Sequence, residues 1–382
     1  MLQSRTNKAP LAEWWRSIDR VTLGLLLALI TAGLILSMAA SPAAVNRLSR
    51  AHSYYEGKPF FFLLRHCLFA GVGLFGAFIV SMMNVTYARR VGVLALIGAA
   101  LALAAVPLIG FEVKGAVRWI SLGPFSLQPS EFIKPGFIVF AAWMFSVRKQ
   151  SPEFPGIAIL FAVYGILVFF LIGQPDFGQS FLLTLCFGAV FFYAGLSLGW
   201  LLFLMAASVG GVIAAFTFLP HVRDRVTRFL NPEGSDTYQT DRALEAIANG
   251  GIFGRGPGEG AIKYKLPDAH TDFIFAVTVE EFGFILSFGL VVLLASFVAR
   301  NFRNALHLND YFSQLAVAGL TTMIGLQTMI NLAVNLNMAP PKGMTLPFIS
   351  YGGSSMLALC FSAGLILALT RKRPGAYGFG VK

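Results

Sequence analysis

One aspartate stands where a long polar segment meets an apolar run. Residues 266–275 read LPDAHTDFIF, and Asp272 is the last charged residue before the apolar run begins. A carboxylate at such a boundary is partly desolvated, which raises its proton affinity and suits a general base. An aspartate at the start of a helix can also cap the helix and complement its dipole. The residues alone leave both interpretations open.

Cationic side chains gather in the same polar segment, residues 220–271. Guanidinium and ammonium groups bind oxyanions such as pyrophosphate through charge-assisted hydrogen bonds. The candidate substrate-binding residues of this segment are Arg223, Arg225, Arg228, Lys263, Lys265 and His270. The alternative is a solvated loop whose charges only face water. Five glycines between positions 250 and 258 predict a flexible stretch, and no GKS or GKT follows them to indicate a nucleotide loop.

A second polar segment adds candidates. Residues 337–355 read NMAPPKGMTLPFISYGGSS, and the candidate substrate-binding residues here are Lys342, Ser350, Gly352 and Gly353. Two further connections, residues 110–130 and 173–180, also place Gly, Pro and polar residues at the ends of apolar runs. This composition is typical of broken or re-entrant backbone, which a membrane tolerates only where it lines protein or a wet cavity.

Several apolar runs contain polar residues that are costly to place in lipid. An unpaired charge at mid-bilayer costs roughly 2.5–3.5 kcal/mol on insertion scales. The structural or supporting polar residues are Glu131, Lys134, Asp176, Glu280, Glu281, Gln327, Asn331 and Asn335. The first two lie three apart on one helix face and could pair. The last three recur every fourth residue, which favours interhelical hydrogen bonds over substrate contacts.

The elements that position these residues are membrane-spanning helices. The chain has 382 residues, of which 56% are hydrophobic and 12% charged, about half the charged fraction of a soluble protein. A span needs about 20 apolar residues. The sequence predicts an all-α polytopic membrane protein of about ten transmembrane helices, at residues 21–40, 60–81, 91–109, 131–145, 155–172, 180–194, 201–219, 273–298, 315–336 and 354–370. A long extracytoplasmic loop, residues 220–272, separates the seventh and eighth spans.

Ten spans place both termini on one side of the membrane. Basic residues beside both terminal spans identify that side as the cytoplasm under the positive-inside rule. We expect a cytoplasmic N-terminal tail at 1–20, a single transmembrane domain at 21–370 and a cytoplasmic C-terminal tail at 371–382. The four polar connections then lie outside. The net charge is +11, but the cations are spread over many short loops, so we expect no nucleic-acid partner.

Four strings, in order, resemble the SEDS family of bacterial cell-wall proteins, which includes RodA, FtsW and SpoVE. They are GQPDFGQS at 173–180, YQTDRALEAIANGGIFGRGPGEG at 238–260, LPDAHTDFIFAVTVEEFG at 266–283 and LPFISYGGSS at 346–355. The resemblance runs nearly end to end. Lys342, within PPKGM, makes the chain most similar to the division-type (FtsW) branch, with the elongation-type (RodA) branch as the alternative. Asp268 and Leu286 are small departures from the family pattern.

The resemblance implies a peptidoglycan glycosyltransferase of the bacterial cytoplasmic (inner) membrane that works in cell division, at the division site. It implies lipid II, the undecaprenyl-pyrophosphate-linked disaccharide-pentapeptide, as substrate. It also implies a class B penicillin-binding protein (the division transpeptidase) and other divisome membrane proteins as partners. Asp272 matches the family's catalytic aspartate. A lipid-pyrophosphate leaving group would be stabilised by cationic side chains, and a divalent cation such as magnesium or manganese is the one candidate cofactor.

Two other functions fit the same residues. A flippase that carries lipid II across the bilayer would also use buried carboxylates and a polar stripe. A non-catalytic divisome scaffold would need none of this chemistry. If Asp272 is not the base, Asp176 and Glu280 are the next candidates.

Overall fold

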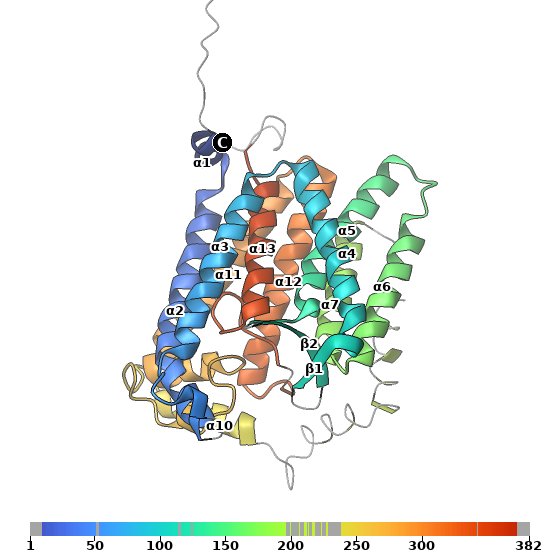
Figure 1. Ribbon diagram of the computed structural model, residues 1–382. Coiled ribbons are helices and arrows are strands. Elements are labelled where there is room, and N and C mark those ends of the chain that lie inside the picture. The colour runs from blue at the N-terminus through green and yellow to red at the C-terminus, as the bar shows by residue number, and fades with distance from the viewer. Residues whose placement is uncertain are drawn as a thin grey trace, which may run out of the picture.

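The computed structural model describes residues 10–372 except for 51–52, 114–115, 124, 342 and most of 196–237. The described part is a bundle of long helices that run roughly side by side (Figure 1). Its helices are α1 (Pro10–Ser17), α2 (Arg20–Ser49), α3 (Phe61–Met82), α4 (Val85–Ile109), α5 (Pro129–Gln150), α6 (Gly156–Gly173), α7 (Phe177–Tyr193), α10 (Tyr238–Gly250), α11 (Ile274–Leu306), α12 (Tyr311–Asn335) and α13 (Gly353–Leu369).

The helices confirm a polytopic membrane protein. Seven described helices are long and apolar enough to cross a membrane, and α7 and α13 are shorter apolar helices. Each of them corresponds to one predicted span. The predicted span at 201–219 lies mostly outside the described residues, so the number of ten spans stays a prediction. Arg225, Arg228 and Lys342 also lie outside the described residues.

The two ends of the bundle differ in character. One end, here called the tail end, carries α1 and residues 371–372, which are joined by a hydrogen bond from Lys372 N to the Ser17 carbonyl at 2.8 Å. The opposite end, here called the loop end, carries α10, a small sheet and the start of α11 (Figure 1). The four polar connections of the sequence all map to the loop end, as far as they are described.

A three-stranded antiparallel sheet at the loop end was not predicted. Its strands are β1 (Gly110–Val113), β2 (Ala116–Leu122) and β3 (Phe125–Leu127), in the order β1-β2-β3. Ile120 pairs with Gly110 on one side and with Leu127 on the other. The sequence analysis expected irregular backbone here. Strand pairing satisfies the same backbone groups that a broken segment would leave open.

Helices α5, α12 and α13 lie in the interior of the bundle, and 14 of the 17 residues of α13 are buried. The apolar window of α5 is 78% buried and that of α12 is 61% buried, against 28% for α3, α4, α6 and α11. The polar side chains of α5 and α12 therefore face protein rather than lipid. Inside the bundle these polar side chains can find hydrogen-bond partners, which lipid cannot supply and which buried polar groups need to be stable.

An ion pair joins α2 to α11 at the tail end. Arg300 donates from Nε and Nη2 to the two carboxylate oxygens of Asp19, both at 2.9 Å, and Asn304 Nδ2 donates to the same carboxylate at 2.6 Å. Burial alone would raise the pKa of the Asp19 carboxyl. The hydrogen bonds from Arg300, Asn304 and Thr22 outweigh burial and hold the pKa below its ordinary value.

Glu259 and Glu13 test which end of the bundle faces the cytoplasm. Both side chains are exposed, Glu259 at the loop end and Glu13 on α1. In a background that lacks the exposed Cys67, we expect Glu259→Cys to react with an impermeant maleimide added to intact spheroplasts. Glu13→Cys should react only after the membrane is opened. The opposite pattern would invert the predicted topology.

Replacing Asp19 by Asn should destabilise the chain at neutral pH. The amide keeps the helix cap but loses the charge that holds Arg300, so unfolding in detergent should become easier by about 1–2 kcal/mol, allowing for the partly exposed guanidinium. A lowered carboxyl pKa means that the stabilisation is lost as the pH falls through that pKa. The difference in melting temperature should therefore shrink in acid. Asp310→Asn, at a cap that holds Ser313, is the control and should change little.

Candidate active site

Asp272 lies two residues before α11, and its side chain is half-buried. The N-cap residue of α11 is Phe273, and no side chain caps it by a hydrogen bond. The first turn of α11 is instead satisfied from another helix, because Ala276 N donates to Asn335 Oδ1 at 3.1 Å. This geometry does not support the interpretation of Asp272 as the N-cap residue of α11.

The backbone at Asp272 is held by the polar stripe of α12. Asn331 Nδ2 and Asn335 Nδ2 both donate to the Asp272 carbonyl oxygen, each at 2.9 Å. Asn331 Nδ2 also donates to the Met344 carbonyl at 2.6 Å. All these groups are buried or half-buried, so the bonds are sheltered from competing water. The stripe thus makes hydrogen bonds between segments and fixes the aspartate relative to the 343–352 loop.

The 343–352 loop packs against the segment that carries Asp272. Tyr351 N donates to the His270 carbonyl at 3.0 Å. Gly343 has φ +64°, and a Cβ there would lie 3.6 Å from Asp272 Oδ2, so this glycine approaches the carboxylate closely. The imidazole of His270 packs 4.3 Å from the Phe62 ring, centroid to centroid. Asp272, His270 and this loop therefore form one site.

Ser350, Gly352 and Gly353 shape the loop. Ser350 is buried, and its hydroxyl accepts a hydrogen bond from Leu346 N at 2.8 Å. A Cβ at Gly353 would lie 2.7 Å from Phe69 Cζ, and one at Gly352 would lie 3.0 Å from Thr345 Cγ2. These contacts explain the residue types by packing. They give the three residues a structural role, and contact of these residues with substrate stays a prediction.

Lys263 does not fit the predicted role of an exposed pyrophosphate ligand. It is 2% exposed, and its ammonium contacts the Glu281 carboxylate. It also donates to the carbonyls of Gly258 at 3.1 Å and Ala39 at 3.2 Å. A buried ammonium whose donors are all occupied cannot bind substrate. Lys265, by contrast, is exposed, as is Arg223.

Glu280 binds the backbone of the segment that contains Lys263. Its carboxylate accepts from Ile262 N at 2.7 Å, Lys263 N at 3.0 Å and Asn249 Nδ2 at 3.2 Å. Glu280 is completely buried. Together with Glu281 and Lys263 it forms a buried charge cluster that fastens the 250–265 segment to α11. Its saturated hydrogen bonding does not favour Glu280 as an alternative base.

Two glycines of the glycine-rich stretch, Gly250 and Gly254, lie against the backbone of α11, whereas Ile252 and Phe253 between them are exposed. α11 is interrupted at Gly283 (φ 77°, ψ 176°). Backbone groups exposed by this break pair with the stretch: Arg255 N donates to the Glu280 carbonyl at 2.9 Å, and Phe284 N donates to the Gly251 carbonyl at 3.0 Å. A Cβ at Gly250 would lie 2.0 Å from the Val279 carbonyl oxygen. At Gly250 and Gly254 glycine is required for close approach to α11, and the flexibility of the stretch stays a prediction.

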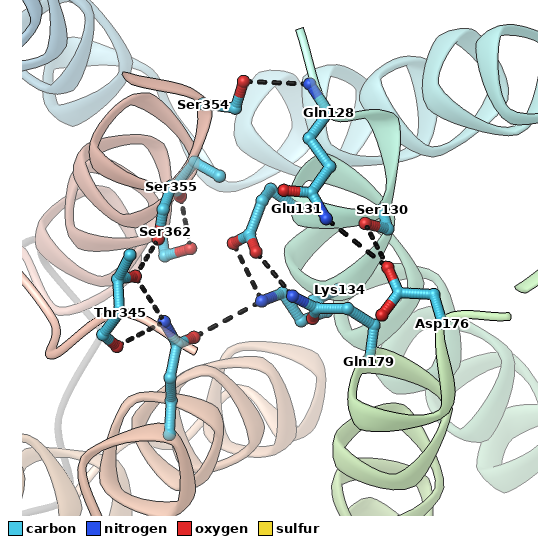
Figure 2. A network of polar contacts seen from close by, with 12 residues as sticks. Gln128, Ser130, Glu131, Lys134, Asp176, Gln179, Thr345, Ser354, Ser355 and Ser362 are labelled. Carbon is cyan, nitrogen blue, oxygen red and sulfur yellow. Dashed lines mark hydrogen bonds and ion pairs between the residues drawn. The ribbon is translucent and has the colours of Figure 1, made fainter. Parts of the chain in front are cut away.

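A second buried network lies between α5, α7 and α12 (Figure 2). Lys134 Nζ donates to Glu131 Oε2 at 2.8 Å and to Gln327 Oε1 at 3.3 Å. Gln179 Nε2 donates to Glu131 Oε1 at 2.6 Å. Gln327 Nε2 in turn donates to the Thr345 carbonyl at 3.1 Å. The Glu131–Lys134 pair is therefore formed, and it is connected to the loop that packs against Asp272.

Asp176 lies at the edge of this network, where α6 gives way to α7. Its carboxylate is buried, 3.8 Å from Arg118 Nη1, and within reach of Gln128 and Ser130 (Figure 2). Burial raises the pKa of the Asp176 carboxyl, and the nearby Arg118 opposes that rise. Arg118 also donates to the Gln174 carbonyl at 3.0 Å. The sequence analysis missed Arg118; a cation inside the 110–130 connection was the available signal.

The described residues do not form a protein-only metal site. No group of three or more His, Cys, Asp or Glu side chains among them could hold a metal ion. A divalent cation at Asp272 would need most of its ligands from the substrate.

Lys263→Ala distinguishes a structural cation from a substrate-binding one. It leaves Glu281 as a buried, unpaired carboxylate, and removing one partner of a buried pair costs about 3–5 kcal/mol. We expect a large loss of thermal stability in detergent. The exposed Lys265→Ala is the matched control and should change stability by less than about 0.5 kcal/mol. Equal stability of the two variants would contradict the structural role.

Comparisons with known proteins agree with this geometry. The FtsW/RodA/SpoVE family model, described as cell cycle protein, matches residues 20–374. A probable peptidoglycan glycosyltransferase FtsW of Caulobacter vibrioides is 46% identical, covering 98% of this chain and 95% of that protein. Stage V sporulation protein E of Bacillus subtilis is 32% identical, covering 93% of this chain and 97% of that protein.

Solved structures give the same fold. A chain of a peptidoglycan synthase complex aligns with a TM-score of 0.75 and 28% identity, over 93% of this chain and 98% of that one. The rod shape determining protein RodA of Thermus thermophilus aligns with a TM-score of 0.68 and 26% identity, over 94% and 99%. The higher identity to a protein named FtsW favours the division-type branch over the RodA type. The chain belongs to the FtsW/RodA/SpoVE family, the SEDS family predicted from its sequence.

Proposed function

We propose that this chain is a peptidoglycan glycosyltransferase that polymerises lipid II during cell division, with Asp272 as the general base. The observation that carries the proposal is the placement of Asp272. Its carboxylate is half-buried at the loop end, and two asparagines of α12 hold its carbonyl. The relatives named peptidoglycan glycosyltransferase FtsW cover nearly the whole chain, which supports the same activity here.

In this mechanism the Asp272 carboxylate takes the proton of the acceptor sugar hydroxyl. The resulting oxygen attacks the anomeric carbon of the donor sugar, and the bond from that carbon to the lipid pyrophosphate breaks. The pyrophosphate leaves with the bonding electron pair. A base fixed before substrate arrives has little reorganisation to undergo during the reaction. The asparagine clamp supplies that fixation.

Cationic side chains would stabilise the leaving pyrophosphate. Arg223 and Lys265 are exposed and therefore accessible, and we retain them as candidates. Arg225, Arg228 and Lys342 stay predictions from the sequence. His270 lies beside Asp272 and its ring packs on Phe62, so we assign it to the wall of the site. Lys263 is excluded by its burial.

The cellular setting follows from the same proposal. Lipid II presents its sugars on the outer face of the bacterial cytoplasmic membrane, so the loop end would face outward and both tails would be cytoplasmic. We further propose action at the division site, with a class B penicillin-binding protein and other divisome membrane proteins as partners. The similarity to a chain from a complex that coordinates polymerization and crosslinking supports such a partner.

The lipid II flippase and the non-catalytic scaffold are outcomes of the same test. Purified chain with its transpeptidase is incubated with labelled lipid II in proteoliposomes. Glycan strands support the glycosyltransferase. Transbilayer movement without strands would identify a flippase. If neither strands nor transbilayer movement is detected, the scaffold function is supported.

Asp272→Asn should abolish most polymerisation without unfolding the chain. The amide retains size and hydrogen bonding but cannot accept the proton, and general-base catalysis contributes about 10²–10⁴-fold. Glycan synthesis should fall by at least about 10²-fold, while melting temperature and partner co-purification are kept. Asp268→Asn is the matched control, because Asp268 has φ 54° and asparagine tolerates that conformation. Activity of Asp272→Asn within a few fold of wild type would remove it as the base and turn attention to Asp176.

A further inference from the structure

A hollow at the loop end lies apart from Asp272 and has no role in the mechanism above. It has a volume of about 360 Å³ and lies between the end of α2, the short helix η1 (Ser53–Tyr55) with the residues that follow it, and the short helix η2 (Ile262–Tyr264). Its lining includes Val45, Asn46, Tyr55, Glu56, Lys58 and Tyr264. The volume is near the lower end of the range of about 300–1,000 Å³ for ligand pockets.

The lining combines aromatic rings with polar groups. Tyr264 is 42% exposed, so much of its side chain is accessible to a ligand. Asn46 and Glu56 are exposed at the hollow and can donate to or accept from hydroxyl and acetamido groups. Lys58 is fixed beside the hollow by a hydrogen bond to the Tyr54 carbonyl at 2.9 Å. An acyl chain would find too many polar groups here, and the opposite charges of Glu56 and Lys58 together give a bare pyrophosphate no net attraction.

This chemistry matches a carbohydrate. A sugar ring presents C–H groups on its faces, which pack on aromatic rings, and hydroxyl groups on its edge, which hydrogen-bond to amide and carboxylate side chains. The shallow, mixed surface fits such a ligand better than a compact apolar molecule.

The hollow is connected to the active site by aromatic contacts. Tyr55 lines the hollow, and its ring stacks on Phe62 with centroids 6.1 Å apart and planes 19° apart. Phe62 contacts the His270 ring at 4.3 Å, and His270 stands two residues before Asp272. The aromatic row therefore joins the hollow to the segment that carries Asp272.

The far wall of the hollow is rigidly placed as well. Tyr264 belongs to η2, whose backbone N–H groups at Ile262 and Lys263 are bound by the buried Glu280 of α11. Since α11 begins just after Asp272, Tyr264 and the proposed base are fixed to the same helix. The position of Tyr264 relative to Asp272 is therefore fixed before a ligand binds.

We infer that this hollow is a glycan-binding subsite that holds the strand made at Asp272. The inference rests on the proposed glycosyltransferase activity. A strand held at a second point stays near the base after each addition, so the subsite favours further addition over release. Loss of the subsite should shorten the strands and leave the first addition almost unaffected.

Direct binding is measured with a peptide-stripped peptidoglycan tetrasaccharide and the full chain carrying Asp272→Asn, which prevents turnover. Adding Tyr264→Ala should weaken tetrasaccharide binding at least about fivefold, the loss expected for one aromatic contact. Tyr264→Phe keeps the ring and should bind within about twofold of its parent. Tyr87→Ala removes a tyrosine of similar exposure from α4, away from the hollow, and should have no effect.

Strand length is measured with Asp272 intact. Tyr264→Ala and Asn46→Ala should each keep the initial rate of lipid II consumption within about twofold while shortening the strands. Unchanged strand length together with unchanged tetrasaccharide affinity overturns the subsite. Failure of the proposed activity looks different, because the wild-type chain would then make no strands at all. Asn46→Ala keeps the test valid if Tyr264→Ala proves unstable.

Discussion

The backbone carbonyl of Asp272 must be satisfied inside the protein, and much of the site depends on how this is done. The residue lies where chain leaves the loop end and enters α11, in a half-buried place. Two asparagine amides of α12 bind that carbonyl, and one of them also binds the Met344 carbonyl. One helix face thus fixes the aspartate and the loop beside it. An apolar residue at position 331 would take this partner from the Met344 carbonyl, and one at position 335 would take it from the Ala276 N–H, at a cost of about 1–3 kcal/mol each.

Buried charges also fix segments near the site at two further places. Glu280, Glu281 and Lys263 fasten the 250–265 segment to a broken α11, and Glu131 with Lys134 joins α5 to α12. Each network is extensively hydrogen-bonded, which is the condition under which charges are tolerated in a low-dielectric interior. Their shared effect is rigidity around Asp272. A preorganised base and a fixed wall are what a glycosyl transfer without nucleotide or covalent cofactor requires of the protein.

The rigid loop end also fixes the side chains that line the hollow beside η2. Its tyrosines are not carried on a free loop; they stand on elements tied to α2, α3 and α11. The aromatic row from Tyr55 through Phe62 to His270 joins the hollow to the Asp272 segment, although these lie far apart in the sequence. Polymerisation and retention of the product would then depend on one set of packed rings.

The membrane class and the family could be predicted from the sequence, because hydrophobic runs and ordered motifs are local properties, and the same motifs singled out Asp272 as the proposed base. The sequence also placed Glu131 and Lys134 on one helix face, and they do pair. It could not show that Lys263 is buried against Glu281, that Gly254 lies against the backbone of α11, or that Arg118 approaches Asp176. Those depend on which segments meet in space. Whether a charge faces water or a partner is decided only by packing, since the same lysine suits either environment until its neighbours are placed.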